Sequence, residues 1–471
     1  MKVIDSTTGE PQTAEAGKDL FDTAVSLHLE NKFDDAEHIY CQLLEQNPNN
    51  QGLMATIGSL YSQTGRHGLG IHFLQAAVDA GMKDSDVFTN LALAYKKSGQ
   101  PEKALGYFEQ SVNVPDATAE ALTNYSGMFI EAGEPKKCID LCERAIKANP
   151  DLLLAHWNLA LALLGEGEWA RGWDEHEWGI KAGGPREDRA VLDIPMWDGT
   201  HGKTVTVYGE QGLGDEIMFA SMLPDLMKTN PVVIECHKRL ETLFKKSFPE
   251  ATVYGTREDA EVSWPLEHTL DYRLAAGSLG KFYRRSRDDF HGNPYLKADP
   301  LPKGNKFRVG ISWKGGGAKM GRVQKRSIPL TWWKPILNVP NVEFVSLQYG
   351  MGKEEELDMM DALGYDIKRF AEADAQDYYD TARLVASCDL VITINTSVVH
   401  LAGALGVPCW TLTPRFPAWR YQNAGGMPWY RSVRQYRSPL PNQEAWKAVV
   451  DKVGLDLGNL VNKRQKLQRV A

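Results

Sequence analysis

Cysteine is scarce in this chain, and a long apolar run is missing. Its 471 residues include six cysteines, and no two of them form a Cys-x-x-Cys pair or a Cys/His zinc spacing. Cys138 and Cys142 lie four residues apart with no matching second pair, so we interpret the cysteines as core residues of a protein in a reducing compartment. The chain lacks the roughly 18 uninterrupted apolar residues of a membrane helix and the apolar core of a signal peptide. We therefore expect a cytoplasmic protein with no membrane span.

An excess of positive charge is also absent. The chain carries 53 lysines and arginines against 61 aspartates and glutamates, which gives a net charge of −8. An acidic chain of this kind is not expected to bind nucleic acid in general. Its hydrophobic content of 43% is ordinary for a globular protein and is sufficient for several domains.

A period of 34 residues runs through the first part of the chain. Glycine recurs at this spacing as Gly65, Gly99, Gly133 and Gly167. A fixed period of this length is typical of helix-turn-helix repeats, and the apolar positions keep the same phase. Small residues such as Gly58 and Gly70 would allow paired helices to approach closely. The pattern resembles the tetratricopeptide repeat family and predicts about five repeats in an α-solenoid over residues 1–185.

Solenoids of this kind commonly hold a protein or peptide on a concave face, although a packing adaptor with no ligand is an alternative. The fifth unit departs from the pattern because it carries Trp169, Trp173 and Trp178. Tryptophans this dense at a domain end favour an interface with the next domain.

Residues 200–299 are predicted to form a first α/β half-sheet. A strand over 203–208 is followed by the turn Glu210-Gln-Gly-Leu-Gly-Asp215 and by a helix over 216–227, and a second strand follows at 232–235. The third glycine of a dinucleotide fingerprint is missing from the turn, so a dinucleotide site is not expected.

The turn supplies the first candidate site residues. Gly212 and Gly214 let the backbone approach a ligand at the carboxyl end of the strand. Asp215 directly follows them, and its carboxylate is either a general base facing the cleft or a cap of the following helix. Glu210 is a further candidate. The spacing alone leaves the choice between base and cap open.

Residues 305–471 are predicted to form a second half-sheet after a Pro/Gly linker. A strand over 308–313 runs into Lys314-Gly-Gly-Gly317, and a second basic group follows at Lys325-Arg326-Ser327. A strand over 342–347 ends at Gln348, and a strand over 389–394 turns at Asn395-Thr-Ser397 into an apolar helix that ends at Gly406. Ligands of doubly wound sheets lie at such carboxyl strand ends.

The chemistry that fits this edge is neutralisation of phosphate charge. Lys314 or Arg326, together with backbone N–H groups at Thr396 and Ser397, could stabilise the negative charge that forms on a departing diphosphate. His400 lies one turn into the last helix, where it either faces the same cleft or is a packing residue. No Asp-x-Asp motif lies between the half-sheets, so we expect no metal ion.

Three segments resemble the bacterial heptosyltransferases, which are glycosyltransferases with the two-domain GT-B fold. These segments are 210–215, Val-Ser-Leu-Gln at 345–348 and Val-Val-His-Leu-Ala-Gly-Ala-Leu-Gly-Val-Pro at 398–408. The resemblance implies an α-solenoid followed by a GT-B pair of half-sheets, with nucleotide-sugar as co-substrate and no other cofactor.

It also implies roles for individual residues. Asp215 would be the catalytic base, and the acceptor side would include Glu210, Gln211, Gly212 and Gly214. The donor side would include Lys314, Arg326, Ser327, Gln348, Asn395, Thr396, Ser397 and His400.

Two positions depart from the family pattern. Asn395 and Ala418 stand where relatives usually carry aspartate, although Asn395 could still cap the helix. The leading hypothesis is an inverting glycosyltransferase whose hydroxyl acceptor is a protein or peptide held by the repeats. A non-catalytic repeat scaffold with a degenerate transferase fold is one alternative. A transferase that acts on a glycolipid or oligosaccharide core is the other.

Overall fold

The structure, a computed structural model, describes residues 3–4, 11–12, 14–181, 184–186, 188–189, 193–315, 327–350 and 352–470. The chain divides into two compact units, residues 1–159 and 160–471. The division falls inside helix α9 (Leu153–Glu166), earlier than the end of the repeats expected near residue 185. The second helix of the fifth repeat, α10 (Trp169–His176), therefore belongs to the same unit as the sheets.

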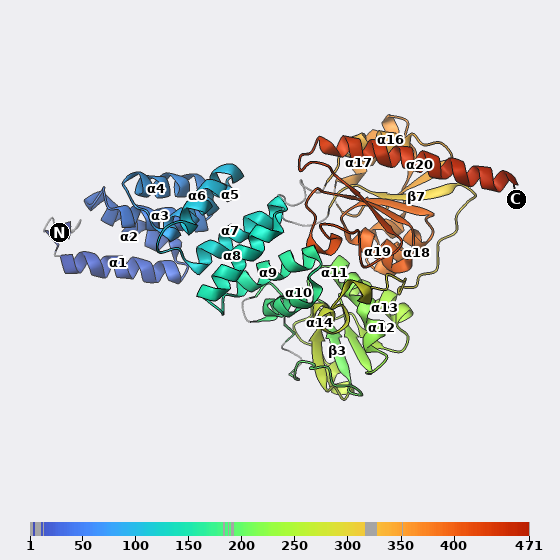
Figure 1. The fold of residues 1–471 in the computed structure, drawn as a ribbon, viewed down its shortest axis with the longest axis horizontal. Helices are drawn as coiled ribbons and strands as arrows, with labels where there is room; N and C mark the ends of the chain where they lie inside the picture. The colour runs from blue at the N-terminus through green and yellow to red at the C-terminus, as the bar shows by residue number, and fades with distance from the viewer. Residues whose placement is uncertain are drawn as a thin grey trace. The chain divides into compact units, whose positions relative to one another are not determined.

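The first unit is built of consecutive paired helices (Figure 1). They are α1 (Ala14–Leu29), α2 (Phe33–Gln46), α3 (Gln51–Gln63), α4 (His67–Asp79), α5 (Ser85–Lys97), α6 (Pro101–Val112), α7 (Ala119–Ala132) and α8 (Pro135–Ala148). The two-residue strands β1 (Val3–Ile4) and β2 (Pro11–Gln12) precede them as an antiparallel pair.

The periodic glycines lie where the first helix of a pair ends. Gly65, Gly99, Gly133 and Gly167 have φ values of 79°, 80°, 71° and 83°, a left-handed conformation that glycine adopts without steric cost. The prediction of close helix approach holds, because a Cβ added to Gly58 would lie only 2.6 Å from Cγ of Leu74.

The first sheet of the second unit has four parallel strands. Its strand order is β5-β4-β3-β6. The strands are β3 (Val205–Tyr208), β4 (Val232–Glu235), β5 (Thr252–Tyr254) and β6 (Tyr272–Ala275). The associated helices are α11 (Leu213–Phe219), α12 (Leu223–Leu226), α13 (Glu241–Ser247) and α14 (Leu279–Tyr283). The single helix expected over 216–227 is interrupted by the 3₁₀ turn Ala220–Met222, and Pro224 lies in the first turn of the new helix α12.

A six-stranded parallel sheet follows, with the order β12-β11-β10-β7-β8-β9. Its strands are β7 (Phe307–Ser312), β8 (Val342–Ser346), β9 (Ile367–Lys368), β10 (Leu390–Ile394), β11 (Cys409–Thr413) and β12 (Val433–Arg437). The chain moves outward from β7 to β9 and then resumes on the other side of β7 with β10. This reversal creates a switch point between β7 and β10, where doubly wound sheets hold their ligands.

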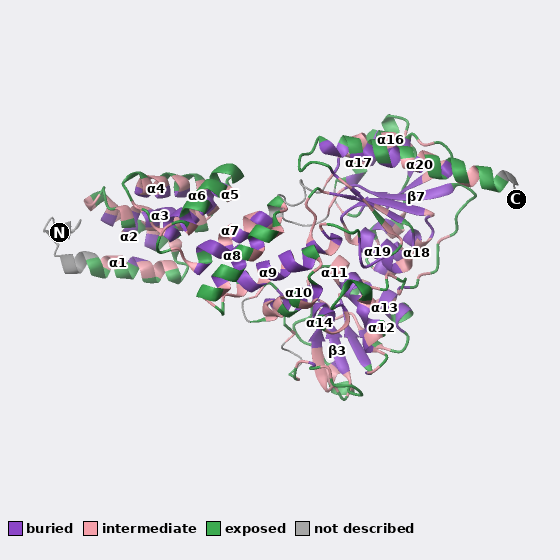
Figure 2. Ribbon diagram, in the orientation of Figure 1, coloured by how far each residue is buried: buried purple, intermediate pink, exposed green. Residues whose placement is uncertain are grey.

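Helices cover both faces of the six-stranded sheet (Figure 1). One face carries α16 (Lys334–Leu337), α17 (Lys353–Ala362) and α20 (Ala445–Val470), which share an apolar core with the strands. The other face carries α18 (Tyr378–Ala386) and α19 (Ser397–Leu405). The core on this second face continues into the four-stranded sheet, so both sheets pack around one apolar cluster. The strands of both sheets are predominantly buried (Figure 2).

Trp169 and Trp173 of the fifth repeat pack where the sequence predicts an interface. Trp173 is completely buried, and its Nε1–H donates to the carbonyl oxygen of Arg284 at 2.9 Å. Its ring lies 5.5 Å from that of Trp419, which follows β11 of the six-stranded sheet. Trp169 lies 4.5 Å from Phe290. Helix α10 is thus anchored to both halves of the sheet region by aromatic contacts.

The described residues therefore form a helical solenoid at the N-terminal side and a region of parallel sheets and helices at the C-terminal side. Among the helices of the described ranges, none is long and apolar enough to span a membrane.

Candidate functional site

A pocket of about 540 Å³ lies between the two sheets, at the switch point of the larger one. Both halves of the second unit contribute to its walls. The candidate residues that line it are Gly214, Asp215, Lys314, Gln348, Asn395, Thr396, Ser397 and His400. These residues span more than half of the second unit in sequence, and the fold brings them to one cavity.

The first turn of α19 forms one wall of the pocket. Thr396 is the N-cap of this helix, and its hydroxyl accepts the backbone N–H of Val398 at 3.3 Å. The expectation that Asn395 caps the helix is wrong. Asn395 is buried, and its Oδ1 accepts hydrogen bonds from the hydroxyls of Thr411 at 2.9 Å and Thr413 at 3.3 Å. Its side chain joins β11 to the end of β10, while Thr396 caps the N-terminus of the helix.

Thr396 occupies two N–H groups of the first turn, since its hydroxyl accepts that of Val398 and its carbonyl oxygen accepts that of Val399 at 3.2 Å. The N–H groups of Thr396 and Ser397 precede these contacts, and the helix dipole adds positive potential at this end. Ser397 is held in place because its Oγ accepts a hydrogen bond from the Tyr378 hydroxyl at 3.0 Å. The arrangement suits an anionic group.

Gly214 lies where α11, on the opposite wall of the pocket, approaches the start of α19. A Cβ added to Gly214 would lie 3.2 Å from both Cδ2 of His400 and Cα of Ser397. The glycine therefore permits α11 to pack against the start of α19. Gly212 is the N-cap of α11, and Gln211 has a left-handed φ of 60°. Gln211 and Gly212 thus shape the turn, and both lie outside the pocket wall.

Buried charge beneath the turn holds it in this shape. The guanidinium of Arg257 donates to the carbonyl oxygen of Gln211 at 2.9 Å and pairs with the carboxylate of Glu216. Glu216 also accepts the backbone N–H of His237 at 2.9 Å. Burial raises the pKa of Glu216 to about 7, and Arg257 opposes this shift. The turn is therefore tied to the loops that follow β4 and β5.

Asp215 contacts the start of α11 and also lies in the pocket wall. Its carboxylate accepts the backbone N–H of Gly212 at 3.4 Å, which is the contact of a residue in the first turn of a helix. The same carboxylate lines the pocket and forms an ion pair with Arg420. Its side chain is 19% exposed. The hydrogen bond to Gly212 is long, so it leaves the carboxylate available to the pocket.

Among the described residues, three lysine and arginine side chains line the pocket. Lys314 pairs with Glu356 at 2.6 Å, so part of its charge is already balanced. Arg239 donates to the carbonyl oxygens of Ala375 at 3.0 Å and Gln376 at 3.2 Å. Arg420 reaches the pocket from the segment after β11.

Sequence reasoning did not identify Arg239 or Arg420 as site residues. Arg239 belongs to no recognisable motif, and the segment that contains Arg420 drew notice only for Ala418, which also lines the pocket. Arg326 lies outside the described residues. Ser327 is described, and its Oγ accepts the backbone N–H of Gly315 at 3.4 Å.

Gln348 positions the loop that follows β7. It is 3% exposed, and its Oε1 accepts the backbone N–H groups of Trp313 at 2.9 Å and Lys314 at 2.8 Å. Its Nε2 donates to the carbonyl oxygens of Lys314 at 3.1 Å and Tyr349 at 3.0 Å. The amide thus binds the ends of β7 and β8 together, which accounts for its place at the pocket wall.

His400 is neutral at physiological pH. Burial lowers the pKa of its imidazole to about 3, and the charge of Arg420 acts in the same direction. Its Nδ1 lies 3.2 Å from the Tyr430 hydroxyl, and its Nε2 lies 3.4 Å from that of Tyr421. His400 lines the pocket as a polar group that cannot neutralise phosphate by charge.

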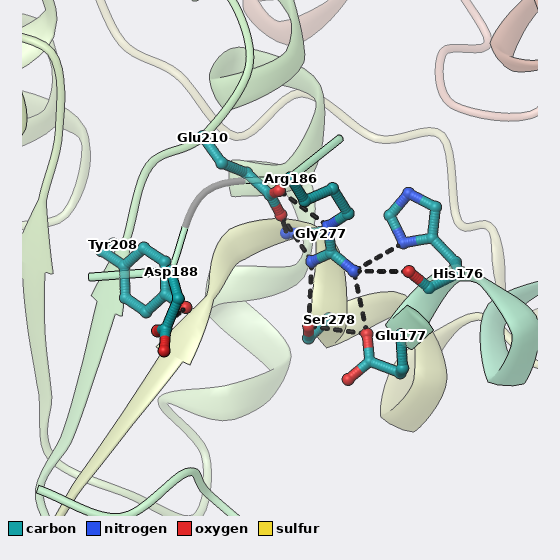
Figure 3. Close-up of polar contacts among 8 residues, drawn as sticks. All are labelled: His176, Glu177, Arg186, Asp188, Tyr208, Glu210, Gly277 and Ser278. Carbon is teal, nitrogen blue, oxygen red and sulfur yellow. Dashed lines mark hydrogen bonds and ion pairs between the residues drawn. The ribbon is translucent and has the colours of Figure 1, made fainter. Parts of the chain in front are cut away.

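The prediction that Glu210 lies on the acceptor side must be corrected. Glu210 is completely buried, and its two carboxylate oxygens accept hydrogen bonds from Arg186 at 2.6 and 2.7 Å (Figure 3). It also accepts the backbone N–H of Gly277 at 2.8 Å. A carboxylate this fully hydrogen-bonded and paired is a structural element.

Arg186 is the centre of this buried cluster (Figure 3). Besides Glu210, its guanidinium contacts Nδ1 of His176 at 2.9 Å, Glu177 at 3.0 Å and Ser278 at 2.9 Å. Glu210 follows β3 and Ser278 follows β6, so the cluster fills the switch point of the smaller sheet. The segment that leads from the repeats therefore occupies the position where a doubly wound sheet would otherwise take a ligand.

Comparisons with known proteins identify one repeat and a longer relative. The tetratricopeptide repeat family matches residues 85–116, which span α5 and α6. The chain carries a tetratricopeptide repeat there. Protein FlbA of Caulobacter vibrioides is 32% identical over 310 residues, which cover 60% of this chain and 52% of FlbA. The chain thus spans about half the length of this curated relative.

Several solved structures are similar over the helical part. The crystal structure of MamA has a TM-score of 0.29 and 19% identity, and covers 35% of this chain and 86% of its own. YrrB, described as a tetratricopeptide repeat protein with an unusual peptide-binding site, has a TM-score of 0.29 and 18% identity, and covers 35% of this chain and 84% of its own. PilF of Pseudomonas aeruginosa has a TM-score of 0.34 and is 14% identical. The match covers 38% of this chain and 81% of the PilF chain.

Proposed function

We propose that this chain is a glycosyltransferase of the GT-B type that moves a sugar from a nucleotide-sugar to a hydroxyl group with inversion and without a metal ion. The observation that carries the proposal is a single pocket in which the carboxylate of Asp215 and the open end of α19 both take part. One wall thus offers a proton acceptor, and the other offers positive potential for a diphosphate.

The reaction divides between these two walls. The carboxylate of Asp215 takes the proton of the acceptor hydroxyl while its oxygen forms a new bond to the anomeric carbon. The bond from that carbon to the β-phosphate oxygen breaks, and the nucleoside diphosphate leaves with the electron pair. Attack opposite to the leaving group inverts the anomeric centre. The N–H groups of Thr396 and Ser397 at the start of α19, with Arg420 and Lys314, balance the charge that forms on the diphosphate.

The acceptor is proposed to be a protein or peptide recruited by the repeats. A tetratricopeptide repeat array suggests protein–protein interaction, since its stacked helices create an extended surface. Arg186 already fills the switch point of the smaller sheet. The acceptor hydroxyl is therefore expected to enter the larger pocket beside Asp215.

Thermal unfolding of the full chain with nucleotide-sugars of each common base is the experiment that tests donor binding. A ligand present at 100 times its Kd stabilises the folded state by about 2.7 kcal/mol, which raises the Tm clearly. Lys314→Ala should weaken this response. Lys245→Ala is the matched control, because Lys245 also forms a carboxylate pair, with Glu241 at 2.7 Å, away from the pocket.

The second measurement separates binding from chemistry. Asp215→Asn should still bind the nucleotide-sugar and should lose sugar transfer to host proteins, because the amide cannot take up the proton. If no nucleotide-sugar raises the Tm, the proposal fails and a repeat scaffold without catalytic activity becomes the better explanation. If ligand binds but Asp215→Asn transfers sugar at the normal rate, the assignment of the base fails.

A further inference from the structure

The ion pair between Asp215 and Arg420 joins the two halves of the pocket. Asp215 lies in α11 of the first half, and Arg420 lies in the short helix Trp419–Tyr421 of the second. The side chains are 19% and 17% exposed, so both reach the cavity and neither is sealed from it. Nε of Arg420 is buried and has no hydrogen-bond partner in the described part of the chain. The guanidinium thus retains an unused donor beside the pocket.

The backbone that carries Arg420 is fixed. Trp419 is buried, and its ring lies 5.5 Å from Trp173. Gln422 has a φ of 57°, and its amide donates to the carbonyl oxygens of Leu164 at 2.8 Å and Trp419 at 2.7 Å. These contacts hold the segment on both sides of Arg420. Any movement of its charge must come from side-chain torsions, for which arginine has several.

The contact has opposite consequences for the two proposed steps. The guanidinium of Arg420 donates to a carboxylate oxygen of Asp215. While this contact persists, that oxygen is occupied and does not accept the proton of an acceptor hydroxyl. A diphosphate at the first turn of α19 would offer Arg420 more negative charge and a two-pronged phosphate contact. Asp215 and a diphosphate therefore compete for the same guanidinium.

We propose that Arg420 is exchanged between these two partners. In the empty pocket it neutralises Asp215, and on donor binding it turns to the diphosphate and frees the carboxylate for the acceptor hydroxyl. This inference rests on the proposed transferase function. It makes nucleotide-sugar binding the event that activates the base, and it places donor binding before productive acceptor binding.

The test is a double-mutant cycle read by calorimetric titration of the full chain with inorganic pyrophosphate. Asp215→Asn releases Arg420, so pyrophosphate affinity should rise about five- to tenfold, because release of the ion pair contributes about fivefold and relief of charge repulsion up to about twofold. In the Arg420→Met background the same substitution should raise affinity about twofold or less, because only charge repulsion is then relieved. Arg420→Met retains the apolar stem that packs over the ring of Trp419, 5.3 Å from the guanidinium carbon.

Arg239→Met is the control, in which the effect of Asp215→Asn is measured again. Arg239 lines the same pocket, but it donates to the carbonyl oxygens of Ala375 and Gln376, outside the Asp215 pair. Asp215→Asn should keep its full five- to tenfold effect in that background. Should Arg420→Met fail to fold, Arg420→Gln is carried through the same cycle.

The outcomes separate this inference from the function on which it rests. An equal rise in affinity with and without Arg420 overturns the exchange, since repulsion alone would explain it, and leaves nucleotide-sugar binding intact. A fall in affinity on Asp215→Asn also overturns it. If the full chain binds neither pyrophosphate nor any nucleotide-sugar, both the exchange and the transferase proposal fail.

Discussion

The buried pair of Arg186 and Glu210 offers a quantitative prediction about stability. Both side chains have no exposed surface, and two hydrogen bonds of 2.6 and 2.7 Å join them. Arg186→Met preserves most of the apolar stem but removes the charge. Glu210 then keeps only the N–H of Gly277 among its described partners. An uncompensated buried carboxylate is costly, and we expect a loss of about 3–5 kcal/mol.

The double variant Arg186→Met/Glu210→Gln should recover most of this loss. Replacement of both members of a buried pair removes the unbalanced charge, and such replacements are often close to neutral. Glu177, which also contacts Arg186, has a side chain that is 27% exposed, so water can solvate its carboxylate after the change. The two substitutions should therefore couple strongly and should not be additive.

Hydrogen exchange is the suitable assay, because a chain with two compact units need not unfold in one step. The opening free energy is followed for amides of β3 and β6. Arg285→Ala is the control, since Arg285 pairs with Asp174 at 2.6 Å with both side chains at least 40% exposed. It should cost less than about 1 kcal/mol. A loss below about 1 kcal/mol for Arg186→Met, or simple additivity in the double variant, would refute the reasoning.

Three further predictions concern the pocket wall. Gln348→Ala should lower stability by about 2–3 kcal/mol in denaturant unfolding, because it leaves buried backbone N–H groups after β7 without an acceptor; retention of full stability would contradict this. Gly214→Val should lower folding stability by about 1–3 kcal/mol and weaken nucleotide binding in titration, because the valine side chain would crowd His400 and Ser397. Unchanged binding would contradict the close approach of α11 to α19. Between about pH 6.5 and pH 3 the unfolded chain takes up a proton that folded His400 excludes, so stability should fall by about 1.4 kcal/mol per pH unit from this group as pH decreases. His400→Asn should make the measured slope shallower, and an unchanged slope would show that His400 is not responsible.

The sequence predicted those features that depend on local pattern. The strand at 232–235 has the predicted bounds, and the strand predicted over 389–394 is found at 390–394. Gly406 ends α19 in a left-handed conformation, as its position before Pro408 indicates. Apolar periodicity and turn glycines are written into neighbouring residues, so a single sequence suffices to read them.

Contacts between distant segments could not be predicted in this way. Glu210 was placed on the acceptor side because it begins a Gly-rich turn, but its partner Arg186 lies 24 residues earlier. Asn395 was expected to cap a helix because of its residue type, whereas Thr411 and Thr413 engage its side chain from the next strand. Arg420 meets Asp215 across 205 residues of chain. No local pattern encodes such pairs, since tertiary packing decides which polar groups meet.

The two switch points of the second unit show how one architecture supports two different uses. At the smaller sheet, Arg186 fills the crevice between β3 and β6 with charges that are already paired and fully buried. That arrangement fixes the turn that carries Asp215. At the larger sheet, the crevice between β7 and β10 remains a pocket of about 540 Å³ whose charged groups are only partly balanced. A preorganised site needs a rigid support and unsatisfied donors in different places. In the proposed function, rigidity at the first switch point supports the binding of nucleotide-sugar at the second.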